Sequence, residues 1–186
     1  MDRINGADTI DIGAGRRGFR SENLVAGQAG TEVTADFLNS IQEELLGLIE
    51  ASGIVADDES WGQLLRAVRS QKLNYFAAGG TANALTITPS PAFGSLADLV
   101  GVPLRIQSSA GNTGAMALNV SGLGAVAVTR KAGGALASGD WPSGVIETLV
   151  YDGTAFRLQS SVIGEFAATG VPSSRYTRLE LSLIHI

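Results

Sequence analysis

Three glycines near the start of the chain have the spacing of a dinucleotide-binding fingerprint. Gly13, Gly15 and Gly18 lie in the segment GAGRRG, which follows the strand-like residues TIDI. In a true fingerprint these glycines open a helix whose N-terminus receives a pyrophosphate, and an acidic residue follows about 20 positions later. The next residues, FRSENLVAGQAG, lack helical periodicity, and Glu32 has no predicted strand to carry it. We therefore expect an arm with flexible glycines, and a dinucleotide-binding enzyme remains only a third alternative.

Hydrolytic and metal-dependent chemistry lacks the residues that it requires. A Ser-His-Asp triad or a histidine metal site needs a histidine, and the chain contains only His185. This residue belongs to LSLIHI, residues 181–186, which looks like translated adaptor or vector read-through; the alternative is a short apolar terminal strand. The chain has no cysteine, which excludes disulfides, thiolate catalysis and thiolate metal sites.

A carboxylate pair for glycosidase chemistry could be sought in Asp57, Asp58 and Glu59. Adjacent acids just before a helix are, however, typical of helix caps and of partners for the helix dipole. We therefore expect no enzyme activity, no cofactor and no metal site.

The elements that position these residues begin with two short amphipathic helices, predicted as a hairpin over residues 34–70. In the first helix apolar residues recur at spacings of three and four, and the acidic residues face the other way. Thr34 is expected to cap this helix, and Gly53 to end it in a left-handed conformation. The second helix is expected to start after Asp57 and Asp58. The apolar residues expected to make core or subunit contacts are Phe37, Leu38, Ile41, Leu45, Leu48, Trp61, Leu64 and Leu65.

After residue 80 the hydrophobic pattern changes from the helical period of about 3.6 residues to the strand period of about 2. Alternating segments occur near residues 85–88, 104–107, 116–120, 126–128, 144–151 and 154–160. Asp152 and Gly153, between the last two segments, form a strong hairpin signal. About six strands at short spacing predict an antiparallel β-sandwich or small β-barrel. The expected fold class is α+β.

The predicted organisation has five parts. They are an extended docking arm at 1–33, the helical hairpin at 34–70, a linker at 71–80, the β module at 81–160 and a C-terminal tail at 161–186, truncated or artefactual at 181–186. The net charge is −5 and the 13 Lys and Arg are scattered, which argues against nucleic acid as a partner. No stretch of about 18 apolar residues is present, so we expect no membrane insertion.

Two parts of the chain resemble the tail-fibre and tail-tip structural proteins of tailed bacteriophages and prophages. Together they cover roughly residues 30–160. One part comprises GTANALTITPSPAF, ALNVSGLGAVAVTR and VYDGTAFRLQS, which are similar to a small β module found repeatedly in phage fibres. The other is similar to the N-terminal helical segment of those proteins, and the residues that carry it are Thr34, Asp36, Phe37, Leu38, Asn39, Gln42, Glu43, Gln63, Leu64 and Leu65.

The resemblance implies a non-enzymatic virion protein, made in the bacterial host cytoplasm, that attaches to a baseplate or tail protein and displays distal modules. Fibre proteins of this family are commonly trimeric, so the resemblance also implies a homotrimer. The alternative function is a host-surface recognition module that binds a glycan or protein through loops such as residues 138–143. In that case Trp141 would stack on a sugar and Asp140 would accept hydrogen bonds from its hydroxyl groups.

Overall fold

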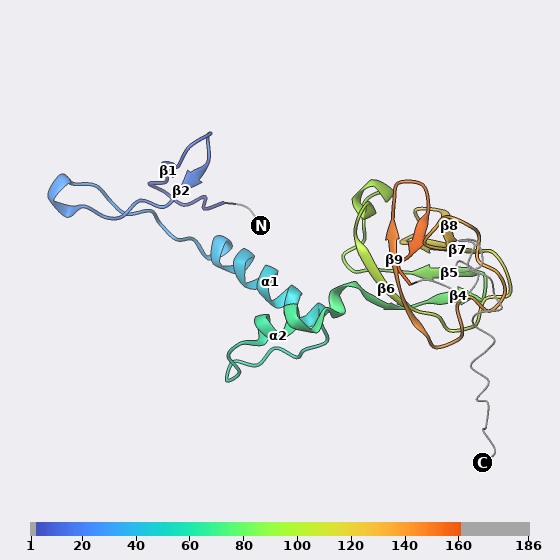
Figure 1. Ribbon diagram of the computed structural model, residues 1–186. Helices are drawn as coiled ribbons and strands as arrows, with labels where there is room; N and C mark the ends of the chain where they lie inside the picture. Colours follow the sequence, from blue (N-terminus) through green and yellow to red (C-terminus); the bar gives the residue numbers. More distant parts are fainter. Residues whose placement is uncertain (1–2, 161–186) are drawn as a thin grey trace, which may run out of the picture. The chain divides into compact units, whose positions relative to one another are not determined.

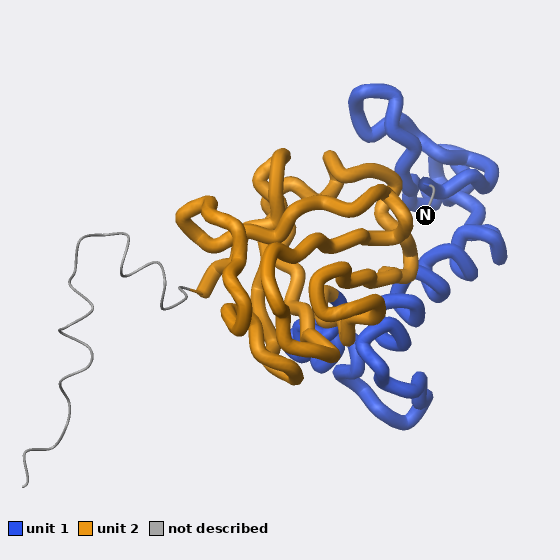
Figure 2. Tube along the Cα trace, turned by 90° about the vertical axis from the view of Figure 1, so that its right-hand side faces the viewer, with its two compact units in different colours: residues 1–73 blue, residues 74–186 orange. Residues whose placement is uncertain are grey.

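The computed structural model describes residues 3–160, which belong to two compact units with a boundary between Leu73 and Asn74 (Figure 2). The predicted tail at 161–186, with His185 and the apolar segment 181–186, lies outside the described residues. The protein is α+β, with both α-helices of the described chain in unit 1 and an eight-stranded sheet in unit 2.

Unit 1 begins with an irregular arm that contains one small hairpin. Strand β1 (Ile10–Asp11) pairs antiparallel with β2 (Arg17–Gly18), and a 3-10 turn, η1 (Leu24–Ala26), follows. The segment GAGRRG is therefore the turn and return strand of a hairpin, and its glycines do not open an α-helix. Gly13 and Gly15 have positive φ angles of 107° and 70°, which glycine adopts without strain and which reverse the chain in this turn. These residues do not have the strand-turn-helix geometry that a dinucleotide fingerprint requires.

Helix α1 (Ala35–Ala51) begins and ends as its sequence predicts. The Thr34 hydroxyl accepts a hydrogen bond from the backbone N–H of Phe37 at 3.3 Å, which confirms the N-cap. Asp36 lies in the first turn, where its charge is favourable to the helix dipole. After the last turn, Gly53 has a φ angle of 79°, which confirms the left-handed residue expected there.

Helix α2 (Gln63–Ser70) starts later than predicted, and Trp61 precedes it. The reason is that the acidic residues form a turn of their own instead of capping the helix. The Asp57 carboxylate accepts the N–H of Glu59 at 3.0 Å, and the Asp57 carbonyl accepts the N–H of Ser60 at 3.3 Å. Gly62 then stands at the N-cap position in a left-handed conformation, without a side chain to cap the helix. Another 3-10 turn, η2 (Lys72–Asn74), follows α2.

Unit 2 is built on one mixed sheet with the strand order β3-β6-β9-β10-β8-β7-β5-β4 (Figure 1). A 3-10 turn, η3 (Leu96–Leu99), lies between β5 and β6. The strands are β3 (Tyr75–Ala77), β4 (Gly79–Thr81), β5 (Ala84–Ile87), β6 (Pro103–Gln107), β7 (Met116–Val120), β8 (Ala125–Thr129), β9 (Ile146–Tyr151) and β10 (Phe156–Leu158).

The six predicted strand segments are confirmed, but the expected antiparallel pairing is wrong in part. Strands β3 and β6, β5 and β7, and β10 and β8 pair in parallel. The predicted linker at 71–80 is also wrong, because β3 and most of β4 lie within it. Both are three-residue strands, too short to show an alternating pattern in the sequence.

The sheet curls into a nearly closed barrel because its two edge strands are consecutive in the chain. Strands β3 and β4 stand at opposite ends of the strand order, yet only Ala78 separates them. Ala78 is buried, and its N–H donates to the Gln107 carbonyl at 2.9 Å. Gly80 allows the close return of β4 along β5, since a Cβ at this position would lie 2.1 Å from the Ala84 carbonyl oxygen.

The barrel encloses a single hydrophobic cluster. Alternate residues of β5, β6 and β7 point into it, which gives the strict buried and less buried alternation of their sequences. The cluster comprises Ala78, Leu85, Ile87, Leu99, Leu104, Ile106, Met116, Leu118, Val120, Val128, Leu136, Trp141, Leu149, Tyr151, Phe156 and Leu158.

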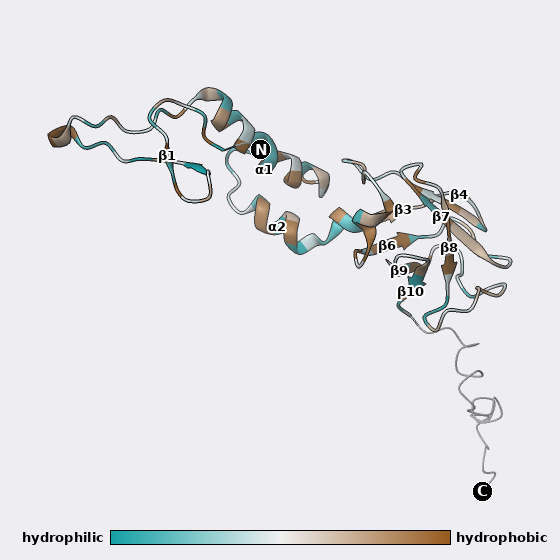
Figure 3. Ribbon diagram, turned by 90° about the horizontal axis from the view of Figure 1, so that it is seen from above, coloured by the Kyte–Doolittle hydropathy of each residue, from teal (hydrophilic) through white to brown (hydrophobic). Residues whose placement is uncertain are grey.

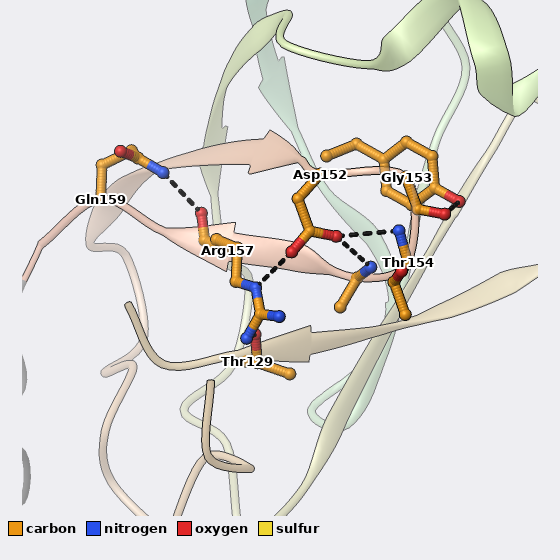
Figure 4. A network of polar contacts seen from close by, with 8 residues as sticks. Thr129, Asp152, Gly153, Thr154, Arg157 and Gln159 are labelled. Carbon is orange, nitrogen blue, oxygen red and sulfur yellow. Dashed lines mark hydrogen bonds and ion pairs between the residues drawn. The ribbon is translucent and has the colours of Figure 1, made fainter. Parts of the chain in front are cut away.

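The hairpin predicted at Asp152 and Gly153 joins β9 to β10, as expected (Figure 4). Gly153 has a φ angle of 94°, and the Asp152 carboxylate accepts the N–H groups of Thr154 and Ala155, each at 2.8 Å. Arg157 donates to the other carboxylate oxygen at 2.6 Å. These bonds lower the pKa of Asp152 to about 2, with the Ala155 N–H as the largest cause, followed by Arg157 and then Thr154.

Candidate assembly surface

The two units differ in where they place their apolar side chains. All members of the hydrophobic cluster belong to unit 2, whereas the described residues of unit 1 bury only Ile4, Ile49 and Ala67 among apolar side chains. Unit 1 instead exposes most of its large apolar residues. They are Ile10, Ile12, Phe19, Leu24, Val25, Val33, Leu38, Leu45, Val55, Trp61, Leu64, Leu65 and Val68.

The side of helix α2 that faces the interior of unit 1 carries no large apolar residue, whereas its exposed side does. Gln63 and Ala67, one turn apart, are buried. Leu64, Leu65 and Val68 are 37%, 53% and 55% exposed, and Figure 3 shows brown, hydrophobic stretches of this helix between teal, hydrophilic ones. A helix that packs only within its own chain buries its large apolar residues. The outer face of α2 is therefore an unpaired apolar surface.

The rotation of α2 is fixed by the polar side chain at its start. The Gln63 amide nitrogen donates to the Val55 carbonyl at 2.8 Å, and its oxygen accepts the N–H of Asp57 at 3.2 Å. Both bonds tie α2 to the loop that leads from α1. Because buried amide groups need hydrogen-bond partners, these contacts hold Gln63, and with it Ala67, on the inner side.

Helix α1 adds to the same kind of surface. Leu38 and Leu45, on its apolar stripe, are exposed, and Ile41 and Leu48 are half-buried. At the first turn Phe37 meets Phe19 of the arm edge to face, with ring centroids 5.5 Å apart and an interplanar angle of 63°. The arm thus covers only the start of the stripe.

For the eight residues predicted to make core or subunit contacts, the two alternatives must be considered separately. None is buried within the chain: five are exposed and three are half-buried. The described chain therefore does not enclose these residues in a core of its own: α2 packs through Gln63 and Ala67, Trp61 precedes the helix, and the α1 residues stay exposed or half-buried. Their use in subunit contacts stays a prediction. The residues are Phe37, Leu38, Ile41, Leu45, Leu48, Trp61, Leu64 and Leu65.

A groove opens in unit 1 between α1 and the loop that precedes α2. Its volume is about 890 Å³, and it is largely open to solvent. The apolar part of the lining comes from Leu45, Leu46 and Val55, with Ala56 beside them. The polar part comes from Gln42, Asp57, Asp58 and Gln63.

The expected ligand contact at Asp140 and Trp141 is wrong. The Trp141 side chain is 0% exposed, and its Nε1 donates to the Val145 carbonyl at 3.0 Å, so it offers no platform for a sugar. Asp140 accepts from Arg130 and from the Ala137 N–H, both at 2.8 Å, and these bonds occupy its carboxylate within the fold. The loop turns inward because the indole completes the barrel core. The exposed tryptophan is instead Trp61, at 95%.

Residues 3–160 contain no group of three or more His, Cys, Asp and Glu side chains that could hold a metal ion. Over the same residues, no helix has the length and apolar character needed to cross a bilayer.

No protein-family model matches the chain. Over 63 residues, the chain is 37% identical to the Uncharacterized protein StfP of Escherichia coli (strain K12). The aligned region is 34% of this chain and 30% of that protein, so the match spans less than a third of the relative's length.

Proposed function

We propose that this protein is a non-enzymatic structural component of a bacteriophage or prophage tail, a fibre or tail-tip part, in which unit 1 assembles with copies of itself. The observation that carries the proposal is the outward apolar face of α2, with Leu64, Leu65 and Val68 exposed beside a helix whose own stripe is half open. The resemblance of both parts of the chain to phage fibre proteins supplies the setting.

The energetics favour burial of this surface between subunits. Moving a fully exposed Leu or Val side chain out of water stabilises by roughly 1.5–3 kcal/mol, and Leu64, Leu65 and Val68, 37–55% exposed, would gain about half of that each. Unit 1 has 73 residues, and those described, 3–73, bury only three apolar side chains, so the unit gains little of this within one chain; small units gain stability by association. A symmetric assembly of copies would bury the same face once for every subunit. The trimer is the oligomer that the resemblance implies.

Unit 2 suits the displayed part of such a protein. Its apolar residues already form a continuous core inside the sheet, and both edge strands are only three residues long. It therefore needs no partner to bury its own cluster. The arm before α1 would then attach the assembly to a baseplate or tail protein, and the virion tail is the proposed location after synthesis in the host cytoplasm.

Light scattering of the full chain after size-exclusion chromatography tests the proposal. We expect a mass three times that of the chain at micromolar concentration. The double variant Leu65→Glu, Val68→Glu places charges on the exposed face of α2 and should reduce the mass to that of a monomer without loss of helical circular dichroism. A wild-type chain that is monomeric at micromolar concentration would overturn the proposal.

A further inference from the structure

We infer that Trp61 of one copy binds in the groove between α1 and the loop before α2 of a neighbouring copy. The inference rests on the proposed self-assembly of unit 1 and names the contact that would drive it. It arises from two complementary features of this unit, an isolated indole and an open groove of matching character.

Trp61 is the most prominent apolar projection of the helical region. It is 95% exposed, and it stands between the turn made by Asp57 and the left-handed Gly62 that starts α2. Tryptophan buries roughly 150–250 Å² when it is enclosed, and it is enriched among residues that dominate interface energies. Burial of this side chain against a partner would therefore contribute a large favourable free energy of binding.

The groove offers the surroundings that an indole requires. Leu45, Leu46 and Val55 give it apolar walls, and Gln42, Asp57 and Asp58 place acceptors at its rim. Its volume of about 890 Å³ leaves room for an indole, and the groove is shallow, with Val55 85% exposed. An indole can pack its ring against the apolar walls while its N–H faces the polar rim.

The groove and the indole of one chain do not meet, because Trp61 is almost fully exposed although Asp57 and Gln63 on either side of it line the groove. A second copy can supply the indole instead. Two copies can exchange Trp61 reciprocally about a two-fold axis, or each copy can give Trp61 to the next and receive one from the previous copy. The second, head-to-tail arrangement closes into a ring when the rotation allows it, and it is the one that matches the proposed trimer.

Charge complementarity supports a second copy as the occupant. The rim beside the groove carries Asp57, Asp58 and Glu59, whereas α2 carries Arg66 and Arg69. Across residues 3–160, none of these five side chains has an ion pair within the chain. Along the helix axis, Arg66 and Arg69 lie roughly 6 and 10 Å from Gly62, and Trp61 is the residue before Gly62. An inserted Trp61 can bring either the arginines of its own α2 or its own acidic turn towards the acidic rim of its neighbour; opposite charges favour the first orientation and like charges oppose the second, so the charges select one orientation of the contact.

The absence of cysteine allows a direct test by disulfide crosslinking. Ser60→Cys keeps Trp61 in place, and Val55→Cys puts a thiol on the groove wall of the other copy. Two full chains of different mass, one with each substitution, are mixed and oxidised. We expect a covalent pair that contains one chain of each kind, and no such pair when Glu43→Cys, on the polar face of α1, replaces Val55→Cys.

Self-association provides the second measurement. Trp61→Ala should raise the dissociation constant about thirtyfold or more, as for a central interface residue, and leave the melting of unit 2 unchanged. Val25→Ala removes another fully exposed apolar side chain, in η1, and should leave the dissociation constant unaltered.

The outcomes separate the inference from the proposed function. An oligomer that forms normally with Trp61→Ala and gives no mixed disulfide would overturn the inference and leave the assembly of unit 1 intact. A mixed disulfide that forms as efficiently with the Glu43→Cys chain as with the Val55→Cys chain would also overturn it, because the contact would then be non-specific. A chain that stays monomeric would overturn both.

Discussion

The side-chain oxygen of Asn112 accepts the backbone N–H of Trp141 at 2.8 Å, across 29 residues of sequence. The Asn112 amide nitrogen donates to the carbonyls of Gly114 and Ala137 at 2.8 and 2.7 Å. One buried amide thus joins two loops of unit 2 and fixes the backbone from which the Trp141 indole enters the core. The position of this tryptophan inside the barrel depends on a polar residue far away in the chain.

Replacing Asn112 by Ala should destabilise unit 2 by about 3 kcal/mol, because three hydrogen bonds are lost and buried backbone groups are left without partners. Urea denaturation followed by tryptophan fluorescence, with Trp61→Phe in both chains so that Trp141 alone gives the signal, would measure the change. Ser109→Ala, a nearby exposed position, should alter stability by less than about 0.5 kcal/mol. Equal stability of the two variants would contradict the role given to Asn112.

Gly80→Ala should destabilise the barrel by about 2 kcal/mol or more. Gly80 has a φ angle of 87°, and a methyl group there would lie 2.1 Å from the Ala84 carbonyl oxygen, so strain and overlap act together. Thermal unfolding monitored by circular dichroism would show the loss. Gly134→Ala, where nothing lies within 4 Å of the added methyl group, serves as the control and should melt as the parent chain does.

The stability of the β9–β10 turn should depend on pH through Asp152. The pKa of Asp152 is lowered from 3.8 to about 2 in the fold, so the ionised form favours the folded state. This contribution is fully present above pH 3.8 and is lost as the pH falls towards about 2. Denaturation of the parent chain and of Asp152→Asn at several pH values should give a stability difference that shrinks over this interval. A difference independent of pH would contradict the assignment.

Gln63→Leu should loosen the loop before α2, because the bonds from its side chain to the Val55 carbonyl and the Asp57 N–H are lost. Hydrogen exchange should become faster at the Asp57 amide by about fivefold or more, which corresponds to about 1 kcal/mol for one hydrogen bond. The α1 amides supply the internal reference, since their hydrogen bonds are unchanged. Unaltered exchange at Asp57 would show that Gln63 does not hold this loop.

Local patterns in the sequence predicted the elements whose causes are local. The cap at Thr34, the stop at Gly53, the turn at Asp152 and Gly153, and six strands all arise from residues within a few positions of one another. The parallel pairing of β3 with β6 and the role of Asn112 join residues about 30 positions apart, which periodicity does not reveal.

The two tryptophans show the same limit of local patterns. Trp141 stands in a loop beside Asp140 and Pro142, yet long-range contacts bury it. Trp61 has apolar neighbours at helical spacing, yet the turn of Asp57 keeps it outside α2 and exposed. Burial within one chain also depends on whether other copies are present, which the spacing of apolar residues does not specify.

The continuity of β3 and β4 through Ala78 affects how closely several copies of this protein can stand together without joining their sheets. An exposed strand edge is a template on which another chain can add a strand, and this is a common route to aggregation. Here both edges of the sheet are three residues long and belong to one continuous segment, which includes the Gly79-Gly80 pair. Barrels held side by side by an assembly of unit 1 would therefore offer one another little backbone to join, and many copies could be crowded together without forming intermolecular sheets.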